Sequence, residues 1–362
     1  MRFAHFAHVW GKPGMTPQQR YELLWRELQL CDALGFDWGF SVEHHFTPLE
    51  SWMSSPNLYA VAAGARTKKL RLGAMGHVVP LHHPVRLIEE IAIVDQMLGG
   101  RLEVGLVPGI QDSYFKPFGV DYPSRREITR EFVHFLKAAY KEPVPFDFDG
   151  KKIHAKDLKI SVDPVQRPHP PLWMESRDPP TLQFCAEQGI HTGYFLLFPR
   201  KQANLRYQPY LEGWKEHGWP GTPNIAYSTV VYVDETDEKA LAVAKNDAAR
   251  AYKGFFSYSD DPVEIRAKQK EAAAYFETRG EPEAADIILH MLEPEYLLEN
   301  DLVLLGSPET VVKKLKAWAV EGRFNCFFGE FNFGSLPEAN LMRSIRLFGE
   351  KVIPQLRDFE PF

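Results

Sequence analysis

Eight strand-like segments alternate with helical patterns along the 362 residues and predict an α/β fold, a (β/α)8 TIM barrel. The segments are rich in β-branched and aromatic residues and form nearly continuous apolar runs, as expected for parallel strands buried on both faces. A doubly wound sheet is the alternative. It is disfavoured because the turn after the first strand reads GKPG and lacks the GxGxxG dinucleotide fingerprint. We therefore expect one barrel domain spanning 1–362.

The predicted strands lie, in chain order, at 2–10, 38–45, 70–79, 101–109, 171–176, 191–197, 225–233 and 324–331. Two of the helices between them carry clear end signals. One begins after Thr16 and ends before Gly35, and the other begins after Ser307 and ends before Gly322. Each glycine comes just before a predicted strand, which is the spacing that a β/α repeat requires.

Two stretches are longer than a plain connection. Residues 144–160 contain an Asp-Gly turn and predict a small hairpin before the fifth strand. Residues 255–301 are rich in Ala, Glu and Pro and are too long for a simple loop. We expect a lid or helical insertion at 255–301, before the last helix and strand, and a dimer-packing arm is an equally open interpretation.

Charge and cysteine content exclude several classes of function. The formal net charge is -6 with no block of like charges, so neither nucleic acid nor an anionic membrane is an expected partner. Cys31, Cys185 and Cys326 lie far apart with no CxxC pair, which disfavours a disulfide framework or a thiolate zinc site. The N-terminus has no apolar signal segment, and the run LYAVAAGA is too short to cross a bilayer. We expect a cytoplasmic protein.

Histidines and carboxylates occur where the predicted strands end, which is where barrel enzymes place catalytic groups. The second strand ends at His44 and His45, and alternation turns Glu43 and His45 to one side and His44 to the other. Only one of the two histidines is therefore expected to be catalytic. A metal centre is disfavoured because His5 and His8 face opposite sides of the first strand. Each histidine alone is equally well explained by hydrogen bonds to strand-end backbone.

Four segments together are typical of one family. They are EHHFT (43–47), LGAMGHVVPLHHPVRLIEEIAIVDQMLGGRLEVGL (72–106), WMESRDPPTLQFCAEQG (173–189) and GSPETVVKKLKAWAVEG (306–322). In order and spacing they resemble the bacterial luciferase-like flavin monooxygenases over nearly the whole chain. The most specific part is HPVRLIEEIAIVDQMLGGRLEVG. The family fold is a (β/α)8 barrel, in agreement with the strand count.

The resemblance implies an active-site residue and a surface for the flavin ring. His44 matches the family's active-site histidine, which transfers protons beside the reactive face of the flavin, a task suited to an imidazole of pKa about 6.5. Ala74, Met75 and Gly76 match a bulge, often with a non-prolyl cis peptide, on which the isoalloxazine ring leans. Phe6 matches an aromatic residue of the flavin pocket, although it could equally fill the barrel.

The resemblance also implies a phosphate site, with one departure. Glu175 and Ser176 match the pair that seats the flavin phosphate after the fifth strand, where a helix start offers N–H groups. The family usually has an arginine after the fourth strand, but this chain reads GLVPG, and Pro108 offers neither charge nor N–H. Our hypothesis for the missing cation is Arg177, next to Ser176.

The function implied is a two-component FMN-dependent monooxygenase. Such an enzyme receives reduced FMN (FMNH2) from a separate flavin reductase and uses O2, through a C4a-peroxyflavin, to oxygenate a small apolar or carbonyl substrate. The alternatives are a deazaflavin-dependent hydride-transfer oxidoreductase and a non-catalytic flavin-binding homologue. Family habit predicts a homodimer, or pairing with a homologous subunit, through the EHHF and HPVR segments. The substrate and the type of oxygenation stay open.

Overall fold

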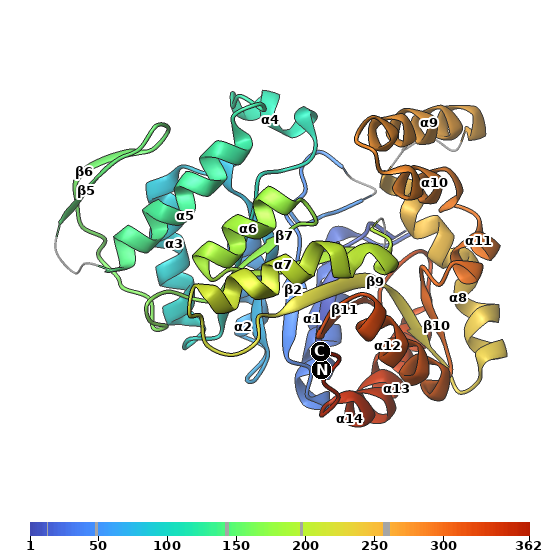
Figure 1. Cartoon of the computed structure of the whole chain (residues 1–362). Coiled ribbons are helices and arrows are strands. Elements are labelled where there is room, and N and C mark those ends of the chain that lie inside the picture. Colours follow the sequence, from blue (N-terminus) through green and yellow to red (C-terminus); the bar gives the residue numbers. More distant parts are fainter. Residues whose placement is uncertain (13, 48–49, 142–144, 196–197, 256–260) are drawn as a thin grey trace.

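The computed structural model describes all residues except 13, 48–49, 142–144, 196–197 and 256–260, and its parallel strands form a closed barrel (Figure 1). Going round the barrel, the strands are β9 (Ile225–Val233), β11 (Cys326–Glu330), β1 (Arg2–Ala7), β2 (Trp38–Ser41), β3 (Arg71–Val78), β4 (Leu102–Val107), β7 (Leu172–Glu175) and β8 (His191–Phe195). Pairing of β8 with β9 closes the ring. A short strand, β10 (Leu304–Gly306), pairs with β9 outside it. The predicted TIM barrel is confirmed.

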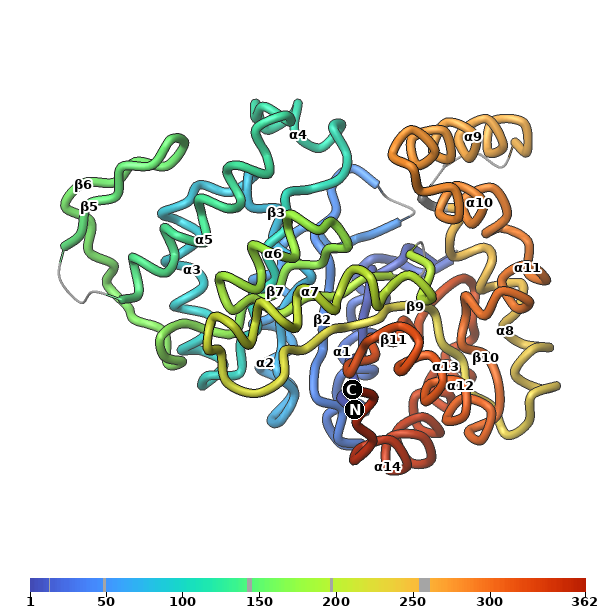
Figure 2. Tube along the Cα trace, viewed as in Figure 1, coloured from blue at the N-terminus to red at the C-terminus, as the bar shows by residue number. Residues whose placement is uncertain are grey.

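Helices surround the strands (Figures 1 and 2). They are α1 (Pro17–Leu34), α2 (Pro56–Gly64), α3 (Pro84–Met97), α4 (Asp112–Phe118), α5 (Arg125–Lys141), α6 (Pro179–Gln188), α7 (Ala203–Glu216), α8 (Asp237–Ala251), α12 (Pro308–Glu321), α13 (Glu338–Leu347) and α14 (Ile353–Leu356). Short 3-10 turns lie at Val79–Leu81, Arg200–Gln202 and Tyr252–Phe255, and a π-helical turn at Phe348–Val352 joins α13 to α14. The two chain ends lie side by side, since the amino group of Met1 donates to the carbonyl of Leu356 at 2.9 Å.

The predicted helix caps are present. The Thr16 hydroxyl accepts from the Gln19 backbone N–H, and the Gln19 side chain accepts from the Thr16 N–H at 2.9 Å, a reciprocal capping box. Ser307 accepts from the Thr310 N–H in the same way at the start of α12. Gly35 ends α1 in the left-handed conformation with φ 80°, which glycine adopts without steric cost.

Several strands end earlier than the sequence predicts, and the difference is largest for the first two. The first strand ends at Ala7, because the next backbone N–H, that of His8, donates to the Glu330 carboxylate at 3.0 Å. The second strand ends at Ser41, and the N–H of His44 donates to the carbonyl of Met53. The predicted end of the strand at 191–197 falls on residues 196–197, outside the described residues.

The two longer stretches have their own secondary structure. The predicted hairpin is confirmed by β5 (Phe146–Asp149) and β6 (His154–Leu158), which pair antiparallel. The stretch predicted at 255–301 contains α9 (Pro262–Thr278), α10 (Pro282–His290) and α11 (Pro294–Glu299), and residues 256–260 of it lie outside the described residues. Figures 1 and 2 show α9 and α10 stacked above α8 at one side of the barrel. Ala273, Ile288 and Leu297 belong to an apolar cluster that joins these helices to α8 and β10.

Aromatic side chains fill the barrel. Trp38, Phe40, Trp173 and Phe328 pack together inside it, and the indoles of Trp38 and Trp173 both donate to the carboxylate of Glu103. The interior is therefore a packed core and not a pore, as is usual for this fold. Within the described residues, no helix combines the length and apolar character needed to cross a membrane. The three cysteines are buried free thiols.

Candidate functional site

Four side chains from different strand ends meet at the carboxyl end of the barrel. His8 follows β1, His44 follows β2, Glu175 ends β7 and Glu330 ends β11. The rings of His8 and His44 lie edge to face with centroids 5.6 Å apart. Nδ1 of His8 lies 2.5 Å from Oε2 of Glu330, and Glu175 is close enough to His8 for their charges to interact. We call this group the barrel-mouth cluster.

His44 is held in place by a buried carboxylate. Its Nδ1 lies 2.9 Å from Oε1 of Glu50 and 3.2 Å from the hydroxyl of Tyr114. Burial acts to raise the pKa of Glu50, but its close contact with the His44 ring and the charges of His44 and His8 outweigh burial, so the pKa is lowered. Because Glu50 engages Nδ1, Nε2 is the nitrogen at which His44 would exchange a proton with a bound molecule. The His44 side chain is 12% exposed, so a small part of the ring is accessible to a bound molecule.

Glu43, His45 and His82 form a hydrogen-bonded network that is separate from the barrel-mouth cluster. Glu43 bonds Nε2 of His45 and Nε2 of His82, both at 2.9 Å, and it accepts from the backbone N–H of Val78. Burial opposes ionisation of Glu43, but the two histidines outweigh it and bring the pKa of Glu43 to about 2. This network ties the segment after β2 to the end of β3. His45 bonds Glu43, whereas His44 contacts Glu50 and Tyr114, so the two histidines have different roles.

The segment predicted to support the flavin ring is a bulge in β3. The register with β4 shifts between Ala74 and His77, and the peptide bond between Met75 and Gly76 is cis. A Cβ on Gly76 would lie 2.4 Å from the carbonyl carbon of Gly105 on β4, so only glycine fits at this position. Met75 and Phe6 belong to the barrel-filling cluster and are slightly exposed, at 8% and 6%. They form apolar surface near the strand ends.

The segment after β7 carries the predicted phosphate residues. Burial raises the pKa of Glu175 to about 7, against the lowering effects of His8 and Arg177. The Ser176 hydroxyl accepts from the N–H of Asp178, which caps α6. The guanidinium of Arg177 is not isolated, because it pairs with Glu281 at 2.6 Å between α9 and α10 and lies over the ring of Phe276.

Sequence reasoning missed one cation near the carboxyl ends of the strands, Arg125. Arg125 begins α5, yet its Nε donates to the carbonyl of Gly109, just beyond β4, at 3.3 Å. β4 pairs directly with β7, so the side chain of Arg125, through Gly109, and Arg177 both lie near the ends of neighbouring strands. Arg125 occurs 17 positions after Pro108, and no motif signals that the chain returns to this strand end.

A groove of about 750 Å³ lies on the surface between α5, the β5–β6 hairpin and the start of α6. Its lining mixes cations and carboxylates, including Arg126, Arg130, Glu131 and Asp149. Since neither His44 nor the β3 bulge lines it, we assign the candidate site to the strand ends and not to this groove. Within the described part of the chain, no group of three or more His, Cys, Asp or Glu side chains is arranged to hold a metal ion.

Comparison with known proteins relates this geometry to one family. The sequence profile described as luciferase-like monooxygenase matches residues 1–325. The alkanal monooxygenase alpha chain of Photobacterium leiognathi is 26% identical over 368 residues, covering 99% of each chain. The oxygenating constituent of 3,6-diketocamphane monooxygenase from Pseudomonas putida, a type II Baeyer-Villiger monooxygenase in complex with FMN, has a TM-score of 0.79 at 21% identity and 98% coverage of both chains. An F420-dependent secondary alcohol dehydrogenase has a TM-score of 0.70 at 18% identity and 99% coverage of both. These two solved structures share the fold.

Proposed function

The chain belongs to the luciferase-like monooxygenase family, and from this premise we propose that it is a two-component monooxygenase using externally supplied reduced FMN and O2. The observation that carries the proposal is the His44–Glu50 pair that follows β2, the strand paired directly with the bulged strand β3. A buried carboxylate fixes one imidazole nitrogen and leaves the other to exchange protons at the mouth. The substrate class that we propose is a small apolar or carbonyl compound, since apolar surface from Phe6 and Met75 lies at the strand ends.

The residues present fit a phosphorylated flavin in two respects. The bulge at Ala74–Gly76 and the ring of Phe6 offer an apolar surface of the kind that an isoalloxazine ring contacts. Arg125 and Arg177, at neighbouring strand ends, offer cations for a phosphate. When bound, the flavin supplies the electrons and the oxygen-activating chemistry, while the chain's residues orient it, exclude water and move protons.

A hydride-transfer enzyme using the deazaflavin coenzyme F420 is the second candidate. It is favoured by the similarity in fold to the F420-dependent secondary alcohol dehydrogenase, which is nearly as extensive as that to the FMN-bound monooxygenase. His44 would be the proton-transfer residue in either candidate. The candidates differ in whether O2 is consumed, because a deazaflavin carries hydride without activating oxygen productively.

Oxygen consumption therefore tests the proposed function. Purified protein is mixed anaerobically with photoreduced FMN and exposed to O2 in a stopped-flow spectrometer, with and without decanal as a carbonyl probe. We expect bound reduced FMN to reoxidise more slowly than free reduced FMN, because a closed pocket limits the escape of reactive species. Reoxidation at the rate of free FMN, together with reduction of coenzyme F420 by a secondary alcohol, would instead identify the second candidate.

Removal of either arginine is expected to weaken FMN binding. A charge-assisted phosphate contact contributes on the order of 2 kcal/mol, so Arg125→Ala and Arg177→Ala should each raise the Kd for FMN by about thirtyfold. Isothermal titration with FMN and with riboflavin, which lacks the phosphate, measures the effect. The matched control is Arg126→Ala, because Arg126 is half-exposed and lies 3.8 Å from Asp178. An equal loss of riboflavin affinity would show that the arginine holds the fold and not the phosphate.

The helices within 255–301 would act as a lid over the proposed flavin site. Glu281, between α9 and α10, reaches Arg177 at the end of β7, so the pair links the insertion to the proposed phosphate site. A phosphate bound at Arg177 would compete with Glu281 for the same guanidinium.

We also propose a homodimer or a pair with a homologous subunit, and a separate reductase as the source of reduced FMN.

A further inference from the structure

Two imidazole–carboxylate pairs face each other at the barrel mouth. His44 pairs with Glu50, His8 pairs with Glu330, and the two rings meet edge to face at 5.6 Å. The proposed function uses only the first pair. The second comes from β1 and β11, which are hydrogen-bonded neighbours in the barrel.

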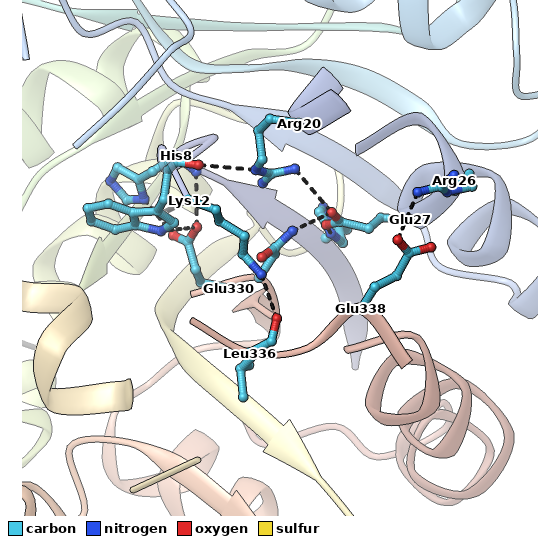
Figure 3. Close-up of polar contacts among 11 residues, drawn as sticks. His8, Lys12, Arg20, Arg26, Glu27, Glu330, Leu336 and Glu338 are labelled. Carbon is cyan, nitrogen blue, oxygen red and sulfur yellow. Dashed lines mark hydrogen bonds and ion pairs between the residues drawn. The ribbon is translucent and has the colours of Figure 1, made fainter. Parts of the chain in front are cut away.

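Glu330 is fixed from several directions (Figure 3). Its Oε1 accepts from the backbone N–H of His8 at 3.0 Å and from the indole of Trp10 at 2.8 Å, while Oε2 bonds Nδ1 of His8. The register that pairs Phe6 with Glu330 brings these groups together, because the chain after β1 passes directly over the end of β11. With Nδ1 of His8 bound to Glu330, any proton that His8 exchanges with a bound molecule is exchanged at Nε2.

The charges around His8 come from three parts of the chain. Glu330 lies on β11, Glu175 ends β7, Glu50 lies on the segment after β2, and His44 is paired with Glu50. Tyr252, at the 3-10 turn after α8, lies near Glu330. Burial lowers the pKa of His8, but the three carboxylates, Glu330 first, outweigh burial and raise it. His8 therefore carries a proton at higher pH than an ordinary histidine.

We propose that His8 is a second proton donor at the barrel mouth, with Glu330 as the positioning residue that holds it. The proposal rests on the proposed function. Oxygenation of a substrate by a reduced flavin anion and O2, with release of water, takes up one proton, and so does the side reaction that releases hydrogen peroxide. His8 gives this proton from Nε2 and regains one from water, while Glu330 stabilises the imidazolium before the transfer.

Histidine-selective NMR tests the pair without cofactor or turnover. In the full-length protein without flavin, the titration midpoint of His8 is assigned with a His8→Asn variant. We expect the midpoint to lie above that of an ordinary histidine and to fall by at least one pH unit in Glu330→Gln, which keeps the shape and removes the charge. The matched control is Glu338→Gln, since Glu338 is half-exposed and pairs with Arg26 outside the mouth (Figure 3). It should leave the midpoint unchanged.

The pH profile of flavin reoxidation tests the role in the reaction. A general acid must be protonated, so the rate falls as pH rises through its pKa. This fall in rate is the alkaline limb of the pH profile. In Glu330→Gln the pKa of His8 should be lower, so the alkaline limb should move to lower pH by the same amount as the NMR midpoint. With photoreduced FMN and O2 as the probe, a limb that stays in place while the midpoint moves would make the pair structural and overturn the proposal.

Failure of the proposed function is distinguishable from failure of this inference. If bound reduced FMN reoxidises at the free rate, the proposed function fails, whereas the NMR midpoint still reports the pair. If Glu330→Gln does not fold, His8→Asn is used, because Glu330 then keeps its indole donor from Trp10. The alkaline limb assigned to His8 should disappear in that variant, and its persistence would also overturn the proposal.

Discussion

Replacing His44 with alanine is expected to lower turnover by about 10²–10⁴-fold while leaving the Kd for FMN nearly unchanged. The ring lies at the mouth with Nδ1 held by Glu50, so its removal takes away a proton-transfer group without touching Arg125 or Arg177. Steady-state oxygen consumption with reduced FMN and decanal measures turnover, and titration with oxidised FMN measures binding. Added imidazole should restore part of the lost rate, because the cavity left by the ring can admit it.

The neighbouring histidine supplies the matched control. His45 bonds Glu43, whereas His44 pairs with Glu50, so His45→Ala should change stability and leave the turnover of folded protein close to that of the unchanged chain. Equal losses of turnover in the two variants would contradict the assignment of His44. Loss of FMN binding in His44→Ala would indicate that the ring holds the cofactor instead of moving protons.

The barrel could be predicted from the sequence because local and global signals agree. Strands buried on both faces require continuous apolar runs, and the helix ends carry Thr16, Ser307 and Gly35 where their caps need them. The small hairpin was likewise predicted from Asp149-Gly150, where β5 ends and the loop to β6 begins. Each of these features depends on residues a few positions apart, which a single sequence reveals.

The ends of the strands could not be predicted in the same way. β2 stops at Ser41 because the backbone of His44 bonds the carbonyl of Met53, a contact that depends on how the intervening segment folds back. The apolar pattern of the sequence alone predicts a strand that continues to residue 45. Because the strand ends early, the segment after it is not bound by strand pairing, and His44 and His45 contact different carboxylates.

Candidate site residues were found where a motif carries them and missed where tertiary structure supplies them. His44 lies in EHHFT, whereas its partner Glu50 comes from the turn that follows. Glu330 lies within the last predicted strand, but its pairing with His8 depends on the register between the first and last strands of the barrel. Arg125 reaches Gly109 from the start of a helix, so spacing along the sequence does not reveal it.

Removing the charge of Glu43 is expected to cause the largest loss of stability. Glu43 is 4% exposed and bonds His45, His82 and the N–H of Val78. Its pKa falls from an unperturbed 4.5 to about 2 in the folded protein, which corresponds to on the order of 3 kcal/mol of stabilisation. Glu43→Gln should lower the free energy of unfolding by about this amount near neutral pH, as is usual when one partner of a buried ionic network is removed.

The sign of the pH dependence follows from the directions of the pKa shifts. Because the folded pKa of Glu43 is lowered, its stabilisation is complete above the unfolded value of 4.5 and is lost as pH falls towards about 2. The pKa of His82 is raised by its hydrogen bond to Glu43, which outweighs burial, so that contribution is present at acid pH and is lost as pH rises through the raised pKa. The difference in the free energy of unfolding between the unchanged chain and Glu43→Gln should therefore be largest between pH 4.5 and the raised pKa of His82, on the acidic side of neutrality.

Urea unfolding followed by tryptophan fluorescence across a pH series measures this difference. His77 complicates the individual curves, because burial lowers its pKa to about 4 and stability falls as pH drops from 6.5 towards that value. The charge of Glu43 acts to raise the pKa of His77, so this acid-side loss is larger in Glu43→Gln and adds to the difference between the two proteins. Glu338→Gln, which removes a half-exposed carboxylate paired with Arg26, should cost about 1 kcal/mol or less with little pH dependence. A Glu43→Gln curve parallel to that of the unchanged chain at every pH would mean that Glu43 stabilises the barrel through shape and hydrogen bonds, and not through its charge.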